Sequence, residues 1–272
     1  MKKIFHLFLA IIATGFIFSF SSCEEDEIET IPLQTVNGEI FELVDFGAKF
    51  FVFEFRTDLE TYPVTYAIRN QSSVENNEII IELLDIQKED FDDINISEGS
   101  ATCTIDLGAL SKGQYNLQIS AGNNSGTGTI SVLDDLVAID FDGTDAITIT
   151  NDTLHRIPFG TVWGYVGYNN SSFTSIANGF ISDMNSLGTQ PPQLPGGYYG
   201  LFSVSDSGNI IQPIGDYNYY KEFFKHYTGD PNELDELVSN YVALYHSRVD
   251  LIFNWFWDGE NKSQMLYLPN EE

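Results

Sequence analysis

The chain has 272 residues, with 40 Asp and Glu against 12 Lys and Arg, and its formal net charge at pH 7 is −28. A surface this acidic repels phosphate backbones, so nucleic acid is excluded as an expected partner. The length suffices for two ordinary domains, and an aromatic content of 14% can supply substantial cores.

The first 23 residues have the layout of an export signal. Two lysines follow the initiating methionine, an apolar run extends from 4 to 20, and Ser21 and Ser22 precede Cys23. A basic start, an apolar run and small residues before the cleavage site are typical of a secretory signal peptide. The alternative is a retained anchor helix, because the run is at the short limit for a membrane span.

Cys23 and the serines before it resemble a bacterial lipobox, in which the cysteine becomes the lipidated first residue. The resemblance implies that 1–22 is a signal peptide and that lipid on Cys23 anchors the protein. The next residues resemble the export tag of surface lipoproteins of Bacteroidetes-type bacteria: Glu24, Glu25, Asp26 and Glu27. The alternative is a solvated acidic tether. We therefore expect an outer-membrane, lipid-anchored protein facing the cell exterior, with 23–37 as its tether.

Cys103 is the second of only two cysteines. If Cys23 carries lipid, Cys103 has no intramolecular partner, so no disulfide framework is expected. It lies in the strand-like segment 101–105, where a free cysteine behaves as a small buried apolar residue.

Residues 38–135 show the alternation of β-strands. Phe51, Phe53 and Phe55 fall on one face of a strand, and several short strands follow at turn-separated intervals. The pattern resembles a bacterial immunoglobulin-like domain, in which Tyr115 takes the place of the corner tyrosine of such sandwiches. The resemblance implies a disulfide-free β-sandwich and names no ligand.

Residues 136–145 are expected to form an acidic junction to a second domain, 146–272, that is richer in Gly, Asn, Tyr and Trp. Asp230 followed by Pro231 predicts a helix start, and 217–227 is predicted to be a short amphipathic helix. Strands are predicted at 146–150, 160–168, 198–204, 210–214, 248–257 and 264–268. The predicted fold class is mainly β: an N-terminal immunoglobulin-like β-sandwich, then a β-rich α+β domain with one or two helices.

The most distinctive motif is an apolar strand that runs into Asp140-Phe-Asp142-Gly-Thr. It resembles the nucleophile motif of haloacid-dehalogenase-type phosphatases. The resemblance implies Asp140 as nucleophile, Asp142 as acid/base and Mg²⁺ as cofactor. That family needs strands that alternate with helices, whereas residues 146–215 have strand- and turn-like patterns with little helical periodicity. An Mg-dependent phosphatase is therefore only a minor alternative.

The same segment supports a calcium hypothesis. Asp140, Asp142 and Asp145 gather carboxylates at the expected junction, and calcium takes several oxygen ligands. The segment lacks the trailing glutamate of a calcium loop, so the alternative is a solvated acidic linker. Apart from possible Ca²⁺, no cofactor is expected, because zinc, phosphate-loop and serine-elbow signatures are absent from the sequence.

Tyrosines in the second domain are candidates for ligand binding, because flat aromatic faces with amide and carboxylate neighbours suit carbohydrates. Tyr198 and Tyr199 adjoin a Pro/Gly loop, and Tyr217, Tyr219 and Tyr220 follow a turn. Exposed aromatics there would form a binding surface. The alternative is that they belong to a hydrophobic core.

Together these features favour a non-enzymatic binding or accessory lipoprotein of the cell surface. Its address and layout resemble the accessory lipoproteins of Bacteroidetes-type nutrient-capture systems, which implies a glycan or another extracellular ligand. The alternative is a structural or adhesion lipoprotein that binds an extracellular protein.

Overall fold

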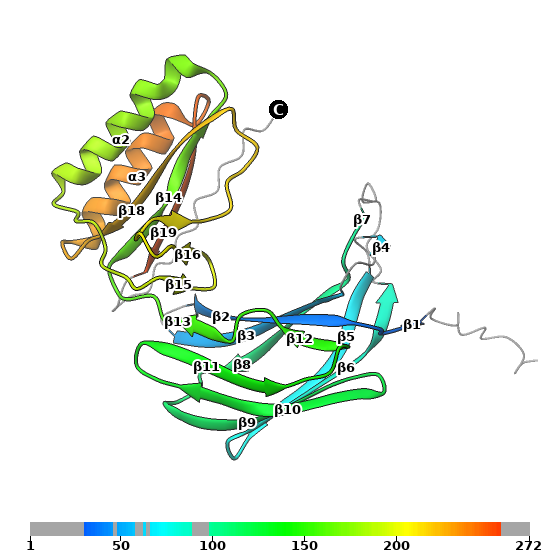
Figure 1. The fold of residues 1–272 in the computed structure, drawn as a ribbon. Coiled ribbons are helices and arrows are strands. Elements are labelled where there is room, and N and C mark those ends of the chain that lie inside the picture. Colours follow the sequence, from blue (N-terminus) through cyan, green and yellow to red (C-terminus); the bar gives the residue numbers. More distant parts are fainter. Residues whose placement is uncertain (1–29, 46–47, 58–61, 64–65, 89–97, 257–272) are drawn as a thin grey trace, which may run out of the picture.

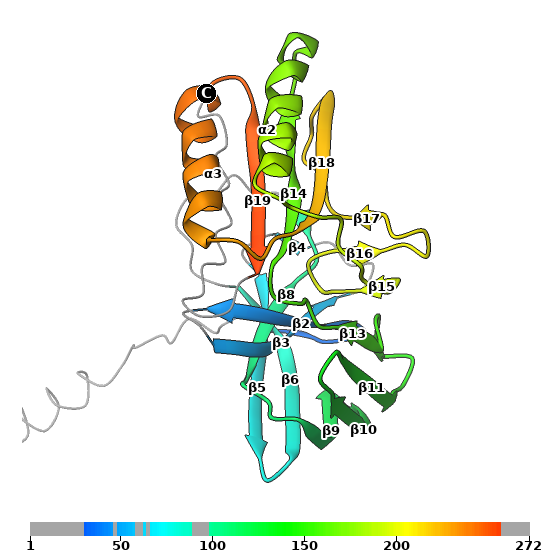
Figure 2. The same ribbon diagram turned by 90° about the vertical axis from the view of Figure 1, so that its left-hand side faces the viewer.

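The computed structural model describes residues 30–45, 48–57, 62–63, 66–88 and 98–256 (Figure 1). Cys23, the acidic run that follows it and the predicted strand 264–268 lie outside these ranges. The described chain is mainly β with few helices, which confirms the predicted class. It forms two units, a large rolled sheet and a smaller sheet covered by two helices (Figures 1 and 2).

The rolled sheet encloses the first core. Its hydrogen-bonded order is β12-β2-β3-β8-β5-β6-β9-β10-β11-β13, with β1 added beside β6. The end strand β12 returns close to β9 and β10, so the two halves of the sheet face each other. The bounds are β1 Thr30–Pro32, β2 Val36–Asp45, β3 Ala48–Thr57, β5 Tyr66–Glu75, β6 Glu78–Lys88, β8 Thr102–Gly108, β9 Gly113–Ala121, β10 Asn124–Val132, β11 Leu136–Asp142, β12 Ile147–Ile149 and β13 Thr153–His155. A separate pair joins β4 Tyr62–Pro63 and β7 Glu98–Gly99.

The alternation of the sequence decides which side chains enter this core. Phe51, Phe53 and Phe55 of β3 are all buried in it, as their spacing predicts. Tyr115, near the start of β9, donates a hydrogen bond from its hydroxyl to the backbone oxygen of Ser111 at 3.0 Å. This bond to the backbone four residues upstream is the geometry of a tyrosine corner.

The segment predicted as a junction, 136–145, belongs largely to the sheet instead. β11 pairs with β10 from Thr127↔Asp142 to Val132↔Val137, and β12 pairs with β2 in parallel. The physical reason is that Val137 and Ile139 are buried while Asp140 and Asp142 are exposed, so this acidic stretch still has one apolar face. Part of the predicted tether also belongs to the sheet, because residues 30–32 form β1.

The smaller unit is built on the central strand β14 (Thr161–Tyr168), which is buried along its whole length. It pairs antiparallel with β18 (Tyr219–His226) and β19 (Asp250–Phe256). Helices α2 (Thr174–Ser186) and α3 (Pro231–Tyr245) cover one face (Figure 2). A second cluster packs on the other face, where the chain forms β15 Gly197–Tyr198, β16 Ser203–Val204 and β17 Ile210–Ile211. These three short strands also extend the rolled sheet, because β15 pairs in parallel with β13.

The helices show where sequence patterns succeed and fail. The predicted start of α3 is confirmed: Pro231 is its first residue, and the Asp230 carboxylate accepts the backbone N–H of Asn232 at 3.0 Å. The predicted helix at 217–227 is wrong, because this segment forms β18. Neither α2 nor α3 is long and apolar enough to cross a membrane.

A buried carboxylate joins the two units. Glu42 of β2 is 5% exposed and accepts hydrogen bonds from Arg156, which follows β13, at 2.9 Å (Nε) and 2.5 Å (Nη2). The Nζ atom of Lys49 lies 3.9 Å from the other Glu42 oxygen and also over the rings of Phe159 and Phe256, at 4.5 and 4.3 Å from their centroids. The smaller unit is thus held against β2 and β3 by one ionic and aromatic cluster.

Cys103 is half-buried in β8, and burial raises the pKa of its thiol to about 12. Because only the thiolate is reactive, we expect native Cys103 to react with a disulfide reagent at pH 8 more than about tenfold slower than the unfolded chain does. The measurement uses a Cys23→Ser chain with and without urea. Equal rates in the two states would contradict the prediction.

Candidate functional site

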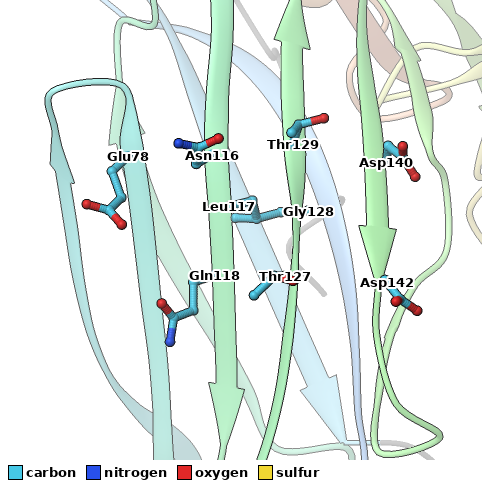
Figure 3. Close-up of a pocket in the computed structure, with 9 residues that line it drawn as sticks. All are labelled: Glu78, Asn116, Leu117, Gln118, Thr127, Gly128, Thr129, Asp140 and Asp142. Atoms are coloured by element: carbon cyan, nitrogen blue, oxygen red, sulfur yellow. The ribbon is translucent and has the colours of Figure 1, made fainter.

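An open groove lies on the outer face of the rolled sheet (Figure 3). It has a volume of about 380 Å³ and crosses β6, β9, β10 and β11. Seven of the nine described residues that line it have polar side chains: Glu78, Asn116, Gln118, Thr127, Thr129, Asp140 and Asp142, beside Leu117 and Gly128. None of the described residues that line it is Lys, Arg or His.

Strand register arranges the polar side chains in two rows. The first row runs across four strands, because Glu78 pairs with Asn116, Asn116 with Thr129, and Thr129 with Asp140. Neighbouring strands are about 4.8 Å apart, so this row spans about 14 Å.

The second row is formed by Gln118, Thr127 and Asp142, which also pair across neighbouring strands. It lies two residues along each strand from the first row, on the same face. The groove therefore presents carboxylate, amide and hydroxyl groups as a regular grid.

Gly128 allows β10 and β11 to approach each other closely beneath this grid. A Cβ atom at this position would lie 2.1 Å from the backbone oxygen of Asp140 and 2.7 Å from the Cα atom of Phe141. Only a residue without a side chain fits between these backbone atoms. Gly128 thereby fixes the spacing of Thr129 and Asp140 in the first row.

A second hollow of about 460 Å³ adjoins the groove and shares Asp140 with it. It lies beside β11 and β12 and the turn between them. Its lining is Ile139, Asp140, Phe141, Gly143, Thr144, Asp145, Ile147, Thr148, Ile149 and Asp152. Asp140 thus lines both hollows, which meet at this residue.

The three carboxylates of the calcium hypothesis are divided between these hollows. Asp142 lines the groove, Asp145 lines the second hollow, and Asp140 lines both. Asp140 and Asp142 are two residues apart on one strand, a separation of about 7 Å. Among the residues that the structure describes, no group of three or more His, Cys, Asp or Glu side chains is placed to hold a metal ion.

The phosphatase-like motif, Asp140 and Asp142, does not lie on the kind of strand that its resemblance to phosphatases implies. Asp140 and Asp142 lie on β11, which is antiparallel to both β10 and β13. In the described chain this strand belongs to no parallel sheet flanked by helices. The two aspartates project outward with amides and threonines, not toward a lysine.

The candidate tyrosines separate into two groups. Tyr199 is 2% exposed, stacks on Phe202 and donates a hydrogen bond to the backbone oxygen of Pro195, so it is a core residue. Tyr198 is half-buried at the contact between the units, where the centroids of its ring and the Phe41 ring lie 6.4 Å apart in an edge-on arrangement. Burial is the main cause that raises the pKa of the Tyr198 hydroxyl, followed by the Glu39 carboxylate.

The other three tyrosines lie together at one end of the small sheet. Tyr219 and Tyr220 are 45% and 48% exposed, and Tyr219 stacks on Tyr168 with centroids 5.7 Å apart. Tyr217 is half-buried and packs on Gly167, where a Cβ atom would come within 2.6 Å of its ring. Only Tyr219 and Tyr220 among the five candidates present broad aromatic faces to solvent.

Asp250, beneath this end of the sheet, was not identified from the sequence. It is 6% exposed, and its Oδ1 atom has no hydrogen-bond partner. Burial raises the pKa of this carboxyl, and a hydrogen bond with Tyr217 partly opposes the rise. No sequence signal marks it, because an aspartate at the first residue of a strand is indistinguishable from one in an exposed turn.

We expect Asp250→Asn to stabilise the protein by about 1 kcal/mol at pH 7.5, because it removes a buried charge that lacks a full set of partners. A raised pKa in the folded state means that the unfolded chain ionises first, so wild-type stability falls as pH rises from about 4 through the folded-state pKa. The difference between variant and wild type should therefore grow between pH 4 and pH 7.5. Urea unfolding at both pH values measures this difference in the free energy of unfolding, and Asp206→Asn is the exposed control. A difference that is the same at pH 4 and pH 7.5 would contradict the prediction.

The groove carboxylates take part in none of the ion pairs between described residues. The pairs lie elsewhere and join Lys49 and Arg156 to Glu42, Arg56 to Glu39 and Glu54, Arg69 to Asp85, and Lys112 to Asp134. Carboxylates without a cation nearby remain available as hydrogen-bond acceptors for a ligand.

Comparison with protein-family models gives no match for this chain. No curated protein matches it, and no solved structure matches it. The interpretation of the site therefore depends on its own geometry.

Proposed function

We propose that this chain is a lipid-anchored binding protein of the bacterial cell surface, and that it binds a glycan in the groove across β6, β9, β10 and β11. The observation that carries the proposal is the two-row grid of amide, hydroxyl and carboxylate groups in an open hollow of about 380 Å³. Its volume lies within the range of small-molecule sites, which is about 300–1,000 Å³.

The chemistry of the grid suits a ligand rich in hydroxyl groups. A sugar hydroxyl both donates and accepts hydrogen bonds. Asn116 and Gln118 can do the same, while Asp140 and Asp142 accept strongly when ionised. Because these side chains project from paired strands, they are held in fixed positions before the ligand arrives, which reduces the entropy lost on binding.

The proposed location is supported by the N-terminal sequence. The lipobox-like serines before Cys23 and the acidic run after it are the features of an exported lipoprotein. Lipid chains would supply membrane attachment that a chain of net charge −28 cannot obtain from an anionic lipid surface. Mass spectrometry of Cys23 in the membrane fraction, with a Cys23→Ser control, tests the anchor separately from binding.

Glycan binding is tested with residues 24–272 on a panel of oligosaccharides, followed by calorimetry on those that bind. The double variant Asn116→Ala/Gln118→Ala should weaken binding at least about tenfold, since each lost hydrogen bond contributes about 1 kcal/mol. Asn240→Ala, an exposed amide on α3, is the matched control and should bind normally. Failure of every glycan to bind would contradict the proposal.

A protein partner is the second candidate, and the exposed pair Tyr219 and Tyr220 favours it. These rings lie at the start of β18, which is an edge strand within the described residues. Exposed aromatics are typical anchors of protein interfaces. Recovery of one surface protein by cross-linking, and its loss in Tyr219→Ser/Tyr220→Ser, would support this candidate over the glycan.

A further inference from the structure

The groove and the second hollow share one lining residue, Asp140. The first row ends at Asp140, and the same residue lines the hollow on the other side of β11. A ligand that follows the row from Glu78 toward β11 therefore meets the second hollow directly after Asp140. Each hollow, at about 380 and 460 Å³, is large enough for part of a longer ligand.

The length of the path sets the size of the ligand. The first row alone spans about 14 Å across four strands, which is longer than one sugar ring. Beyond Asp140 the polar groups continue in Asp145, Thr148 and Asp152. A monosaccharide would engage only a fraction of these groups, whereas an extended chain of sugars could contact both hollows at once.

The charge of the residues that line the two hollows indicates the chemical class of the ligand. Neither lining contains a Lys, Arg or His, while both contain several carboxylates. A uronic acid or a sulfated sugar placed there would meet like charges with no cation to balance them, and the net charge of −28 would oppose its approach. Such repulsion discriminates between ligands as effectively as attraction does.

We propose, on the basis of the proposed function, that the ligand is a linear oligosaccharide without acidic groups that spans the groove and the second hollow, with Asp140 as the acceptor at their boundary. Asp140 contacts the middle of the chain. Asp142 and the amides contact one part of it, and Asp145 contacts the other part.

The experiment uses residues 24–272 and gluco- and galacto-oligosaccharides of two to six units in three chemical forms: neutral, amino-substituted, and uronic-acid or sulfated. We expect at least one neutral or amino series to bind, with affinity rising at least about tenfold from two to six units. Asp140→Asn should weaken all lengths. Asp145→Asn should weaken the hexamer and leave the dimer unchanged, while Asp206→Asn should change neither.

The outcomes separate the two proposals. If acidic oligosaccharides bind as well as neutral ones, or a dimer binds as tightly as a hexamer, and binding still depends on Asn116 and Gln118, the proposed function stands and this inference is overturned. If Asp145→Asn affects dimer and hexamer equally, the spanning geometry is overturned. If no oligosaccharide of any form binds, both proposals fall.

Discussion

Replacing Glu42 with alanine is expected to lower the free energy of unfolding by about 3 kcal/mol, the low end of the range for breaking a buried ion pair. The variant leaves Arg156, whose side chain is only 22% exposed, without its carboxylate. It also removes the carboxylate that lies 3.9 Å from the Nζ atom of Lys49, beside two aromatic rings. Urea unfolding of wild type and variant measures the loss.

The control for Glu42 is Lys112→Ala. Lys112 and Asp134 form an ion pair whose side chains are 63% and 83% exposed, and such pairs contribute at most about 1 kcal/mol. The double variant Glu42→Ala/Arg156→Ala should lose less than the sum of the two single variants, because the two side chains interact directly. Additive losses, or equal losses at Glu42 and Lys112, would contradict the role of the buried cluster.

Replacing Gly128 with valine is expected to lower the free energy of unfolding by about 3 kcal/mol and to abolish groove binding. A Cβ atom would overlap the backbone oxygen of Asp140, and backbone cannot move aside as the end of a flexible side chain can. The expected loss corresponds to the upper range for overpacking. The strands β10 and β11 would separate, which displaces Asp140 from Thr129 in the first row.

Thermal unfolding and glycan calorimetry measure the two effects of Gly128→Val. The control is Gly208→Ala in an exposed turn, where no atom lies within 4 Å of the added Cβ. It has a positive φ of 79°, so a modest loss of stability is expected without any loss of binding. A stable Gly128→Val protein with unchanged glycan affinity would show that the close approach of β10 and β11 is not needed.

Local features of the fold could be predicted from the sequence where they depend on a few neighbouring residues. The Asp230-Pro231 helix start and the Tyr115 corner each depend on a few neighbouring residues, and both have the predicted geometry. The alternating phenylalanines of β3 likewise identify a buried face without knowledge of its partners.

Helix α2 is not predicted from the sequence, and strand β18 lies in a segment predicted as a helix. In α2, Ala177, Phe180 and Met184 do follow helical spacing and are buried, but Gly179 and the Asn and Ser residues throughout the helix conceal the pattern. In β18, adjacent Phe223 and Phe224 serve opposite faces of one strand. Two apolar neighbours of this kind are as compatible with a helix as with a buried strand.

The groove required knowledge of register, which no single strand contains. The outward positions of Asn116, Gln118, Thr127 and Thr129 follow from alternation on the β9–β10 hairpin. Their alignment with Glu78 depends on the parallel pairing of β6 with β9, between strands far apart in the sequence. The motif at Asp140 was recognised as acidic, but only the pairing of β11 with β10 showed which residues share its face.

The parallel pairing of β12 with β2 has a mechanical consequence. Ile147–Ile149 aligns with residues 36–38, while the other edge of β2 is hydrogen-bonded to β3 along its whole length. If Cys23 carries the proposed lipid anchor, a pulling force on the N-terminus enters the sheet through β1, which pairs with β6, and then at the start of β2. Because β2 is bonded on both sides by strands that run along the direction of pull, the load is shared by many hydrogen bonds sheared together. We therefore expect the first unit to resist extension by flow or by a bound polymer.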